Sequence, residues 1–210
     1  MNVIVFGATG GTGQELVRQG LERGHTVTAF LRSPDKLRVQ HERLKPVQGD
    51  VFDAPSVLAA CQGQAAALIA LGGKPRGPQP CATGTLHAAL GLQAHGGRRL
   101  ICLSSLGVGD SKDEPGWAFR HLLVPLLLRA EMADKEQQEQ VVRHCGLEWV
   151  IARPGGLTKG PATGTYQAAL HWTAHGTPRI SRADVAHFML DQLTSDRWLG
   201  QAVALGNTAG

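Results

Sequence analysis

The sequence predicts an α/β protein, a single-domain Rossmann fold in which helices cover both faces of a doubly wound parallel sheet. Two observations predict this fold class. Short β-branched runs alternate with longer helical patterns along the chain, which is typical of βαβ units. A glycine-rich turn also joins the first of these runs to the first helix. With 210 residues the chain suits one domain, residues 1–210.

Seven short runs have the near-continuous apolar character expected of strands buried on both faces of a parallel sheet. Turn residues and helical segments separate them, so consecutive strands are expected to run in the same direction. The predicted strands are residues 2–7, 26–31, 45–48, 66–71, 99–104 and 148–153, with a weaker one near 202–205.

The segments between these strands have helical patterns, and glycines mark two of their ends. Gly24 follows the first helix, and Gly96 and Gly97 follow the helix that begins near residue 81. Ser181 and Asp184 are expected to form the N-cap pair of the last helix. The predicted helices are 12–23, 54–61, 81–95, 119–145 with a break at Pro125, and 182–194. The loops 72–80, 105–118 and 154–178 each follow a strand, so all three are expected at the carboxyl edge of the sheet, where ligands bind.

Charge and apolar patterning exclude two classes of protein. The net charge is +4, but the cations are scattered and the longest basic run is the pair Arg98-Arg99, so nucleic-acid binding is not expected. A basic cleft for a phosphorylated cofactor accounts equally well for the excess. The longest apolar stretch, 122–128, is far below the ~20 residues that span a bilayer, so no membrane segment is expected.

The start of the chain and its cysteines indicate the compartment. The chain enters its first strand at once, without a charged leader, which predicts a cytoplasmic protein. The four cysteines lie far apart with no CxxC spacing, so neither a metal site nor a disulfide is expected.

The turn after the first strand predicts a dinucleotide site. Gly7, Gly10 and Gly13 directly follow that strand and open the first helix, so peptide N–H groups and the positive helix end can converge on a diphosphate. A Cβ at Gly10 would lie where the phosphates approach, and one at Gly13 would hold the helix away from the sheet. The residues expected to bind the phosphates are Gly7, Thr9, Gly10, Gly11, Thr12 and Gly13.

The end of the second strand predicts NADPH/NADP rather than NADH. Arg32 lies 19 residues beyond Gly13, where a carboxylate would hold a ribose hydroxyl, and its guanidinium suits a 2′-phosphate instead. Ser33 and Lys36 are expected to add donors to the same phosphate. Asp35 is expected to turn outward. The alternative is that Arg32 and Lys36 form a solvated loop face.

Five segments resemble a known family. The spacing from Gly7 to Gly13, the triplet Gly49-Asp50-Val51 and the triplet Leu71-Gly72-Gly73 resemble the atypical short-chain dehydrogenase/reductases. Ser104-Ser105 and residues 179–189 look like the biliverdin IXβ reductases, also called NADPH-dependent flavin reductases. The resemblance covers nearly the whole chain.

The resemblance implies roles for further residues. Asp50 and Val51 would contact the adenine, while Leu71 and Gly72, with Gly73, would line the adenosine and ribose side; Pro154 and Gly155 would flank the nicotinamide, with Ser104 and Ser105 beside it. Ser105 is the candidate catalytic hydrogen-bond donor. It is equally open as a structural hydroxyl at a strand end.

The chain lacks the Tyr–Lys pair by which ordinary members of the superfamily reduce carbonyls. Its one tyrosine, Tyr166, is followed four positions on by Leu170, and Glu131 stands four positions before Lys135. Lys135 is therefore expected to be a surface or cofactor-facing cation. Hydride transfer to a planar conjugated acceptor remains possible, because the charge that develops is delocalised and the reaction chiefly requires proximity.

The expected function is an NADPH-dependent reductase of a flavin, a biliverdin-type tetrapyrrole or a quinone. Leu106, Trp117 and Phe119 are expected to line the acceptor pocket, although aromatic packing without substrate contact is an open alternative for the loops that carry them. A non-catalytic NADP(H) sensor is the alternative function. A sugar-nucleotide epimerase is disfavoured, because it usually needs the phenol and a larger C-terminal domain. The chain is expected to be a monomer whose partner is a small molecule.

Overall fold

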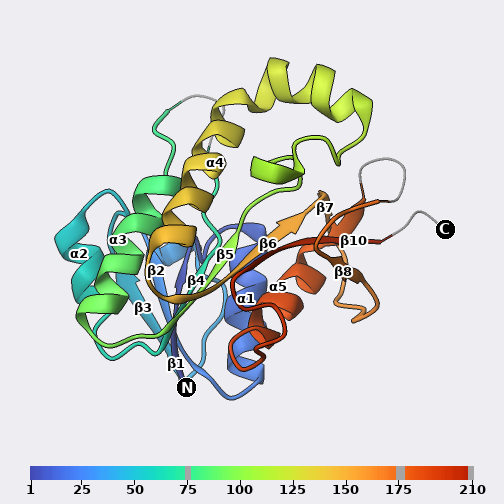
Figure 1. Ribbon diagram of the computed structural model, residues 1–210. Coiled ribbons are helices and arrows are strands. Elements are labelled where there is room, and N and C mark those ends of the chain that lie inside the picture. The colour runs from blue at the N-terminus through green and yellow to red at the C-terminus, as the bar shows by residue number, and fades with distance from the viewer. Residues whose placement is uncertain (74–76, 174–177, 208–210) are drawn as a thin grey trace.

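A computed structural model describes residues 1–73, 77–173 and 178–207, and it contains one eight-stranded sheet (Figure 1). The strand order is β3-β2-β1-β4-β5-β6-β10-β8, so the order reverses between β1 and β4. Every pair is parallel except β10 with β8. The strands are β1 (Asn2–Phe6), β2 (Thr26–Leu31), β3 (Leu44–Gln48), β4 (Ala66–Ile69), β5 (Arg99–Leu103), β6 (Glu148–Pro154), β8 (Gln167–Ala169) and β10 (Gln201–Gly206). Residues 74–76 and 174–177, within two predicted loops, lie outside the description.

Helices cover both faces of the sheet, as the sequence predicts. On one face lie α1 (Gly11–Glu22) and α5 (Arg182–Asp191), and on the other lie α2 (Ala54–Ala60), α3 (Cys81–Ala94) and α4 (Arg129–His144) (Figure 1). Alternate side chains of one strand enter the two cores, because successive residues point to opposite faces. Val3 and Val5 pack with α1 and α5, whereas Ile4 and Phe6 pack with α2 and α3. The single-domain Rossmann fold is thereby confirmed.

The predicted loop 154–178 and the residues directly after it contain strands that the sequence did not reveal. Gly156–Thr158 (β7) pairs in parallel with Arg179–Ser181 (β9) in a second small sheet, and β8 joins the edge of the main sheet. Each of these strands has three residues. A segment that short carries too few residues for an alternating pattern to be recognised. Their pairing depends on contacts between distant segments.

The helix predicted over 119–145 is divided differently from the expectation. Phe119–Leu128 forms a π-helical segment, η3, and the α-helix α4 begins at Arg129. The predicted break at Pro125 is therefore wrong in position, since Pro125 lies inside η3. Proline lacks an N–H group and its ring clashes with the carbonyl four residues back in an α-helix, and the wider π-helical turn removes that register. Two single-turn 3₁₀ helices, η1 (Pro34–Lys36) and η2 (Gly109–Ser111), complete the elements.

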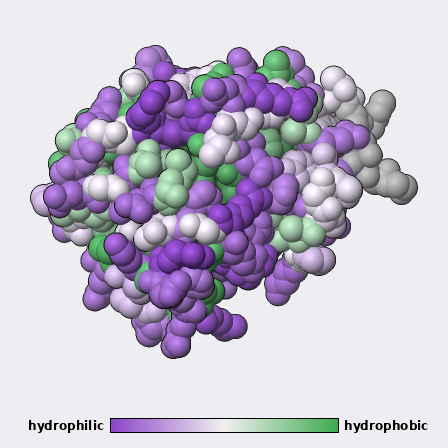
Figure 2. All heavy atoms as spheres, turned by 90° about the horizontal axis from the view of Figure 1, so that it is seen from below, coloured by the Kyte–Doolittle hydropathy of each residue, from purple (hydrophilic) through white to green (hydrophobic). Residues whose placement is uncertain are grey.

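The face of the molecule in Figure 2 is largely hydrophilic, with apolar residues in small groups. Apolar exposure is instead concentrated in η3, none of whose residues is buried, and Leu126 and Leu127 are 76% and 65% exposed. Among the residues that the structure describes, no helix combines the length and the apolar character needed to cross a bilayer.

Candidate functional site

The turn between β1 and α1 has a geometry that two of its glycines require. Gly7 has a φ of 82°, and a Cβ there would overlap the carbonyl oxygen of Ala70. A Cβ on Gly13 would overlap the carbonyl oxygen of Gly7, so any side chain would push the start of α1 off the turn. The amide of Gly10 closes the turn on Gly7 O at 3.0 Å. The amides in the first turn of α1 have no acceptor within the helix, which suits an anion.

A cleft of about 410 Å³ opens beside this turn, at the point where the strand order reverses. Ligands of open α/β sheets bind at this position. Eight of the residues predicted to hold the cofactor meet there: Gly7, Thr9, Gly10, Arg32, Asp50, Val51, Leu71 and Gly72. The other lining residues are Phe30, Leu31, Gly49, Phe52, Ala70, Gly77, Pro78 and Pro80. Of the described residues, those that line the cleft are thus mostly small or apolar, together with the guanidinium of Arg32 and the carboxylate of Asp50.

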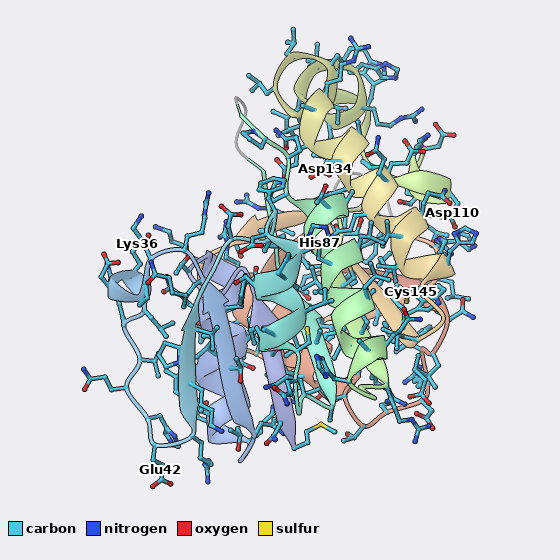
Figure 3. The ribbon with its side chains drawn as sticks, turned by 90° about the vertical axis from the view of Figure 1, so that its left-hand side faces the viewer. Lys36, Glu42, His87, Asp110, Asp134 and Cys145 are labelled. Carbon is cyan, nitrogen blue, oxygen red and sulfur yellow. The ribbon has the colours of Figure 1, made fainter. Side chains whose placement is uncertain are left out.

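Arg32 is an exposed cation at the end of β2, directly against this cleft. Within the described ranges no carboxylate lies within 4.0 Å of its guanidinium, as the ion pairs of the chain show. Ser33 directly precedes η1 and Lys36 ends it, but neither residue lines the cleft. Lys36 points outward in Figure 3. Asp35 is exposed and away from the cleft, as expected. Among the residues that the structure describes, Arg32 is therefore the cation that lines the cleft and is available to a phosphate there.

The segment after β3, the strand next to β2, carries the residues that the resemblance assigns to the adenine. The Asp50 carboxylate accepts a hydrogen bond from the Phe52 amide at 3.1 Å, and the Val51 carbonyl pairs with His87 Nδ1 at 2.8 Å. Phe52 lines the cleft and is 41% exposed. The sequence reasoning missed Phe52, although an aromatic residue directly after Asp50-Val51 was the available signal. An exposed ring at the rim suits a planar base.

The ends of β5 and β6 lie side by side, and the hydroxyl groups of the two serines that follow β5 have different partners there. The amide of Ser104 donates to Ala152 O at 2.8 Å. The Ser104 hydroxyl donates to the buried carboxylate of Glu139 at 2.6 Å, so it points into the protein. Ser105 is half-buried, and within the described residues its hydroxyl makes one hydrogen bond, to Leu106 O at 3.2 Å. Of the pair, Ser105 is the hydroxyl open to a ligand.

The remaining predicted cofactor residues lie outside the 410 Å³ cleft. Thr12 is buried in the first turn of α1, where Gly11 is exposed. Gly73 packs against Gln79. Pro154 O accepts the Leu106 amide at 2.9 Å, and the next residue, Gly155, lies so close to Pro178 that a Cβ would overlap its carbonyl oxygen. These residues are positioned by main-chain packing at the carboxyl edge of the sheet.

Lys135 is buried on α4, so the expectation of a surface position is wrong and the cofactor-facing alternative remains. It is 5% exposed, and its Nζ donates to Leu103 O, at the end of β5, at 3.2 Å. Across residues 1–73, 77–173 and 178–207 no carboxylate lies within 4.0 Å of this ammonium. The missed signal is helical spacing, because Lys135, Gln138 and Val142 share the buried face of α4. A buried ammonium with one neutral acceptor has donors to spare beside Ser104 and Ser105.

Tyr166 is distant from Lys135 in the architecture. Its hydroxyl pairs with His187 Nδ1 at 3.2 Å, and its ring meets Phe188 edge to face on the α1 and α5 side of the sheet. Burial raises the pKa of Tyr166 well above its usual value. Lys135 lies on α4, on the other face.

The three residues predicted for the acceptor pocket do not meet in one cavity. Leu106 is 1% exposed and packs in a small core with Trp172 and Ala204. Trp117 is 68% exposed, and its ring lies tilted against that of His121, with ring centroids 5.3 Å apart. Phe119 lines a second cavity of about 420 Å³ between the loop after β5, η3 and α4. Phe119 is thus the member of this group that borders an open space.

The last helix and the cysteines behave as structural features. The Ser181 hydroxyl accepts from the Asp184 amide at 2.9 Å, so the predicted N-cap of α5 is confirmed. All four cysteines are free thiols, and burial raises the pKa of Cys61 and of Cys81 to about 12. Within the part of the chain that the structure describes, no three His, Cys, Asp or Glu side chains are grouped to hold a metal ion.

Comparison with known proteins adds a family and a set of neighbours. The sequence profile of a family described as NAD(P)H-binding matches residues 7–196. An uncharacterised chloroplastic protein of Arabidopsis thaliana, At2g34460, is 30% identical over 177 residues, which cover 77% of this chain and 61% of that protein. The chain therefore spans less than two thirds of that relative's length.

Two solved structures share the fold. ChuY of Escherichia coli O157:H7, described as an anaerobillin reductase, is 25% identical with a TM-score of 0.84, and the match covers 100% of this chain and 98% of that one. A wide-type short-chain dehydrogenase/reductase of Veillonella parvula, solved in complex with NADP, is 18% identical with a TM-score of 0.79 over 99% of this chain and 95% of that one.

Proposed function

The chain belongs to the NAD(P)H-binding family, and from this premise we propose that it is an oxidoreductase, namely an NADPH-dependent reductase of a planar conjugated acceptor. The acceptor class is a flavin, a linear tetrapyrrole or a quinone. ChuY, which this chain matches over its whole length, is described as an anaerobillin reductase, and this supports the tetrapyrrole member of that class.

One observation carries the choice of NADPH. Arg32 lines the same cleft as the phosphate loop and has no carboxylate partner in the described chain. An unpaired guanidinium beside a nucleotide cleft favours a ligand with one more phosphate than NADH has. The cofactor supplies the hydride when it is bound. The chain's own contribution begins with the amides of the first turn of α1, which hold the phosphates.

The residues around the ends of β5 and β6 have a positioning role in this proposal. Lys135 offers spare donors next to Leu103, and Ser105 offers a hydroxyl two residues later. Both can orient a ligand without giving up a proton of their own. The one tyrosine is engaged with His187 on the other face of the sheet, which supports a reaction without a phenol as proton donor. A conjugated acceptor can take its proton from water, because its charge is spread over many atoms.

A panel of acceptors tests the proposal. NADPH and NADH oxidation is measured with FMN, riboflavin, biliverdin isomers and quinones, and with simple aldehydes and ketones as the matched controls. We expect turnover with at least one planar acceptor, a preference for NADPH and no turnover with the simple carbonyls. Tight NADPH binding without turnover of any acceptor would contradict the proposal and favour a non-catalytic NADP(H) sensor.

A further inference from the structure

Arg182, the first residue of α5, lies across the start of the phosphate loop's helix. A Cβ atom built on Gly11 would come within 2.6 Å of Arg182 Cδ and 2.8 Å of its Nε. The guanidinium end of the side chain therefore passes directly over Gly11, at the first residue of α1. A side chain at position 11 would displace it. The glycine is thus required here by Arg182 and not by backbone conformation, because its φ is not in the left-handed region.

The rest of the protein holds Arg182 in this position. Its Nη1 donates to the carbonyl oxygen of Thr158 at 3.1 Å, at the end of β7. The pairing of β7 with β9 brings Thr158 opposite Ser181, the N-cap of α5. Asp184, three residues after Ser181, accepts hydrogen bonds from the amides of Thr163 and Gly164 at 2.7 and 2.9 Å. These contacts fix the start of α5 against β7 and the chain that follows it. They therefore hold the Arg182 guanidinium in place independently of the phosphate loop.

The charge at this position is unfavourable without an anion. The start of α1 is the positive end of the helix dipole, and its first turn contains no acidic residue. In residues 1–73, 77–173 and 178–207 no carboxylate lies within 4.0 Å of the Arg182 guanidinium, whereas Arg18 and Arg23 on the same helix region are each paired. A cation beside a positive helix end is repelled by that end. An anion bound between the two is attracted by both, so the site favours an anion.

We infer that Arg182 binds the diphosphate that NADPH and NADH have in common, and that it acts in the cofactor site in addition to Arg32. The inference rests on the proposed function only in taking this cleft as the nucleotide site. The two arginines then have separate tasks. Arg32, at the end of β2, distinguishes the cofactors by the 2′-phosphate, and Arg182, over Gly11, contributes to both cofactors equally.

Binding measured by calorimetry tests the inference without turnover. The Arg182→Met variant should lose about tenfold or more in affinity for NADPH and for NADH by the same factor, as expected for the loss of a charge-assisted contact. Its affinity for adenosine 2′-phosphate, which has no diphosphate, should stay within about twofold. Arg18→Met, on the outer face of α1 and 44% exposed, is the matched control and should bind both cofactors as the unmodified protein does.

A second test displaces the Arg182 guanidinium while its charge is kept. Gly11→Ala places a methyl group where Arg182 lies, so it should weaken both cofactors, and the Gly11→Ala/Arg182→Met double variant should lose much less than the sum of the two single losses. Arg182→Lys should retain part of the affinity. NADPH binding by Arg182→Met within twofold of the unmodified protein would overturn the inference. No heat with either cofactor in the unmodified protein would instead overturn the proposed function.

Discussion

The guanidinium of Arg153 donates to both carboxylate oxygens of Glu139, at 2.9 Å from Nε and 2.6 Å from Nη2, with both side chains almost completely buried. The pair joins β6 to α4. The Ser104 hydroxyl adds a third donor to the same carboxylate, and Asp110 accepts a hydrogen bond from Arg153 at 2.5 Å at the exposed end. That hydrogen bond lowers the pKa of Asp110 below its usual value. The ends of β5 and β6 are thereby tied to one buried ion pair.

Removing one partner of this pair should be strongly destabilising. Glu139→Ala leaves the Arg153 charge buried without its main partner, and we expect the free energy of unfolding to fall by about 3 to 5 kcal/mol. Urea unfolding measures the loss. The Glu139→Leu/Arg153→Met double variant, which removes both charges, should lose less than Glu139→Ala alone. Glu136 lies on α4, as Glu139 does, and forms an exposed ion pair with Lys112. Glu136→Ala is therefore the control and should change the free energy of unfolding by less than about 1 kcal/mol.

Asp134 should contribute to stability as a cap for a helix to which it does not belong. Its two carboxylate oxygens accept the amides of Cys81 and Ala82 at 2.7 and 3.0 Å, at the start of α3, where Pro80 provides no side-chain cap (Figure 3). Asp134→Ala should therefore lower the free energy of unfolding by about 2 kcal/mol. Asp134→Asn keeps one acceptor oxygen and should lose less. Equal stability of all three proteins in thermal unfolding would refute this assignment.

Local steric and spacing rules were sufficient for much of this architecture. The parallel strands follow from apolar runs, and Gly7 and Gly13 follow from the close approach of the helix to the turn. Arg32 was found by its distance from Gly13 along the chain. Each of these features is specified by neighbours in sequence or by a repeated unit.

The features that the sequence did not reveal depend on distant partners. Arg182 reaches Gly11 only because α5 packs beside α1, and Lys135 is buried only because α4 packs on α3. Leu106 was assigned to a pocket, yet it packs against Trp172 from a much later segment. The short strands β7 and β9 likewise exist through pairing with each other. Secondary-structure propensity and hydrophobic periodicity are local properties of the sequence, so they do not predict contacts between distant segments.

Replacing Arg32 should change which cofactor is preferred. Arg32→Ala removes the guanidinium from the cleft, so NADPH binding should weaken by about 1 to 3 kcal/mol while NADH binding stays nearly constant. Calorimetric titration with both cofactors measures the difference. Arg38→Ala, an exposed cation outside the cleft, is the control and should leave both affinities unchanged. Equal losses for the two cofactors in Arg32→Ala would contradict the role in phosphate selection.

Stability should fall in alkaline solution because of buried thiols. Burial raises the pKa of Cys61 and of Cys81 from 9.0 to about 12 in the folded protein, so only the unfolded chain ionises these thiols between those values. The contribution of these thiols to the free energy of unfolding is complete below pH 9.0. It is lost as the pH rises above that value, at about 1.4 kcal/mol per pH unit for each thiol. Urea unfolding across this range should show the slope, and a Cys61→Ala/Cys81→Ala variant should lose that part of it.

Lys135 offers a test in which binding and stability should change in opposite directions. Lys135 is 5% exposed, and within the described residues its ammonium has one acceptor, the neutral Leu103 O, so its burial is costly to the folded protein. If the spare donors serve the cofactor, Lys135→Met should bind NADPH at least about tenfold more weakly while its urea midpoint is unchanged or higher. Lys112→Met, which breaks an exposed pair with Glu136, is the control for charge alone. A purely structural lysine would give the reverse result, a lower midpoint with unaltered NADPH affinity, because the 3.2 Å hydrogen bond to β5 would then be its whole contribution.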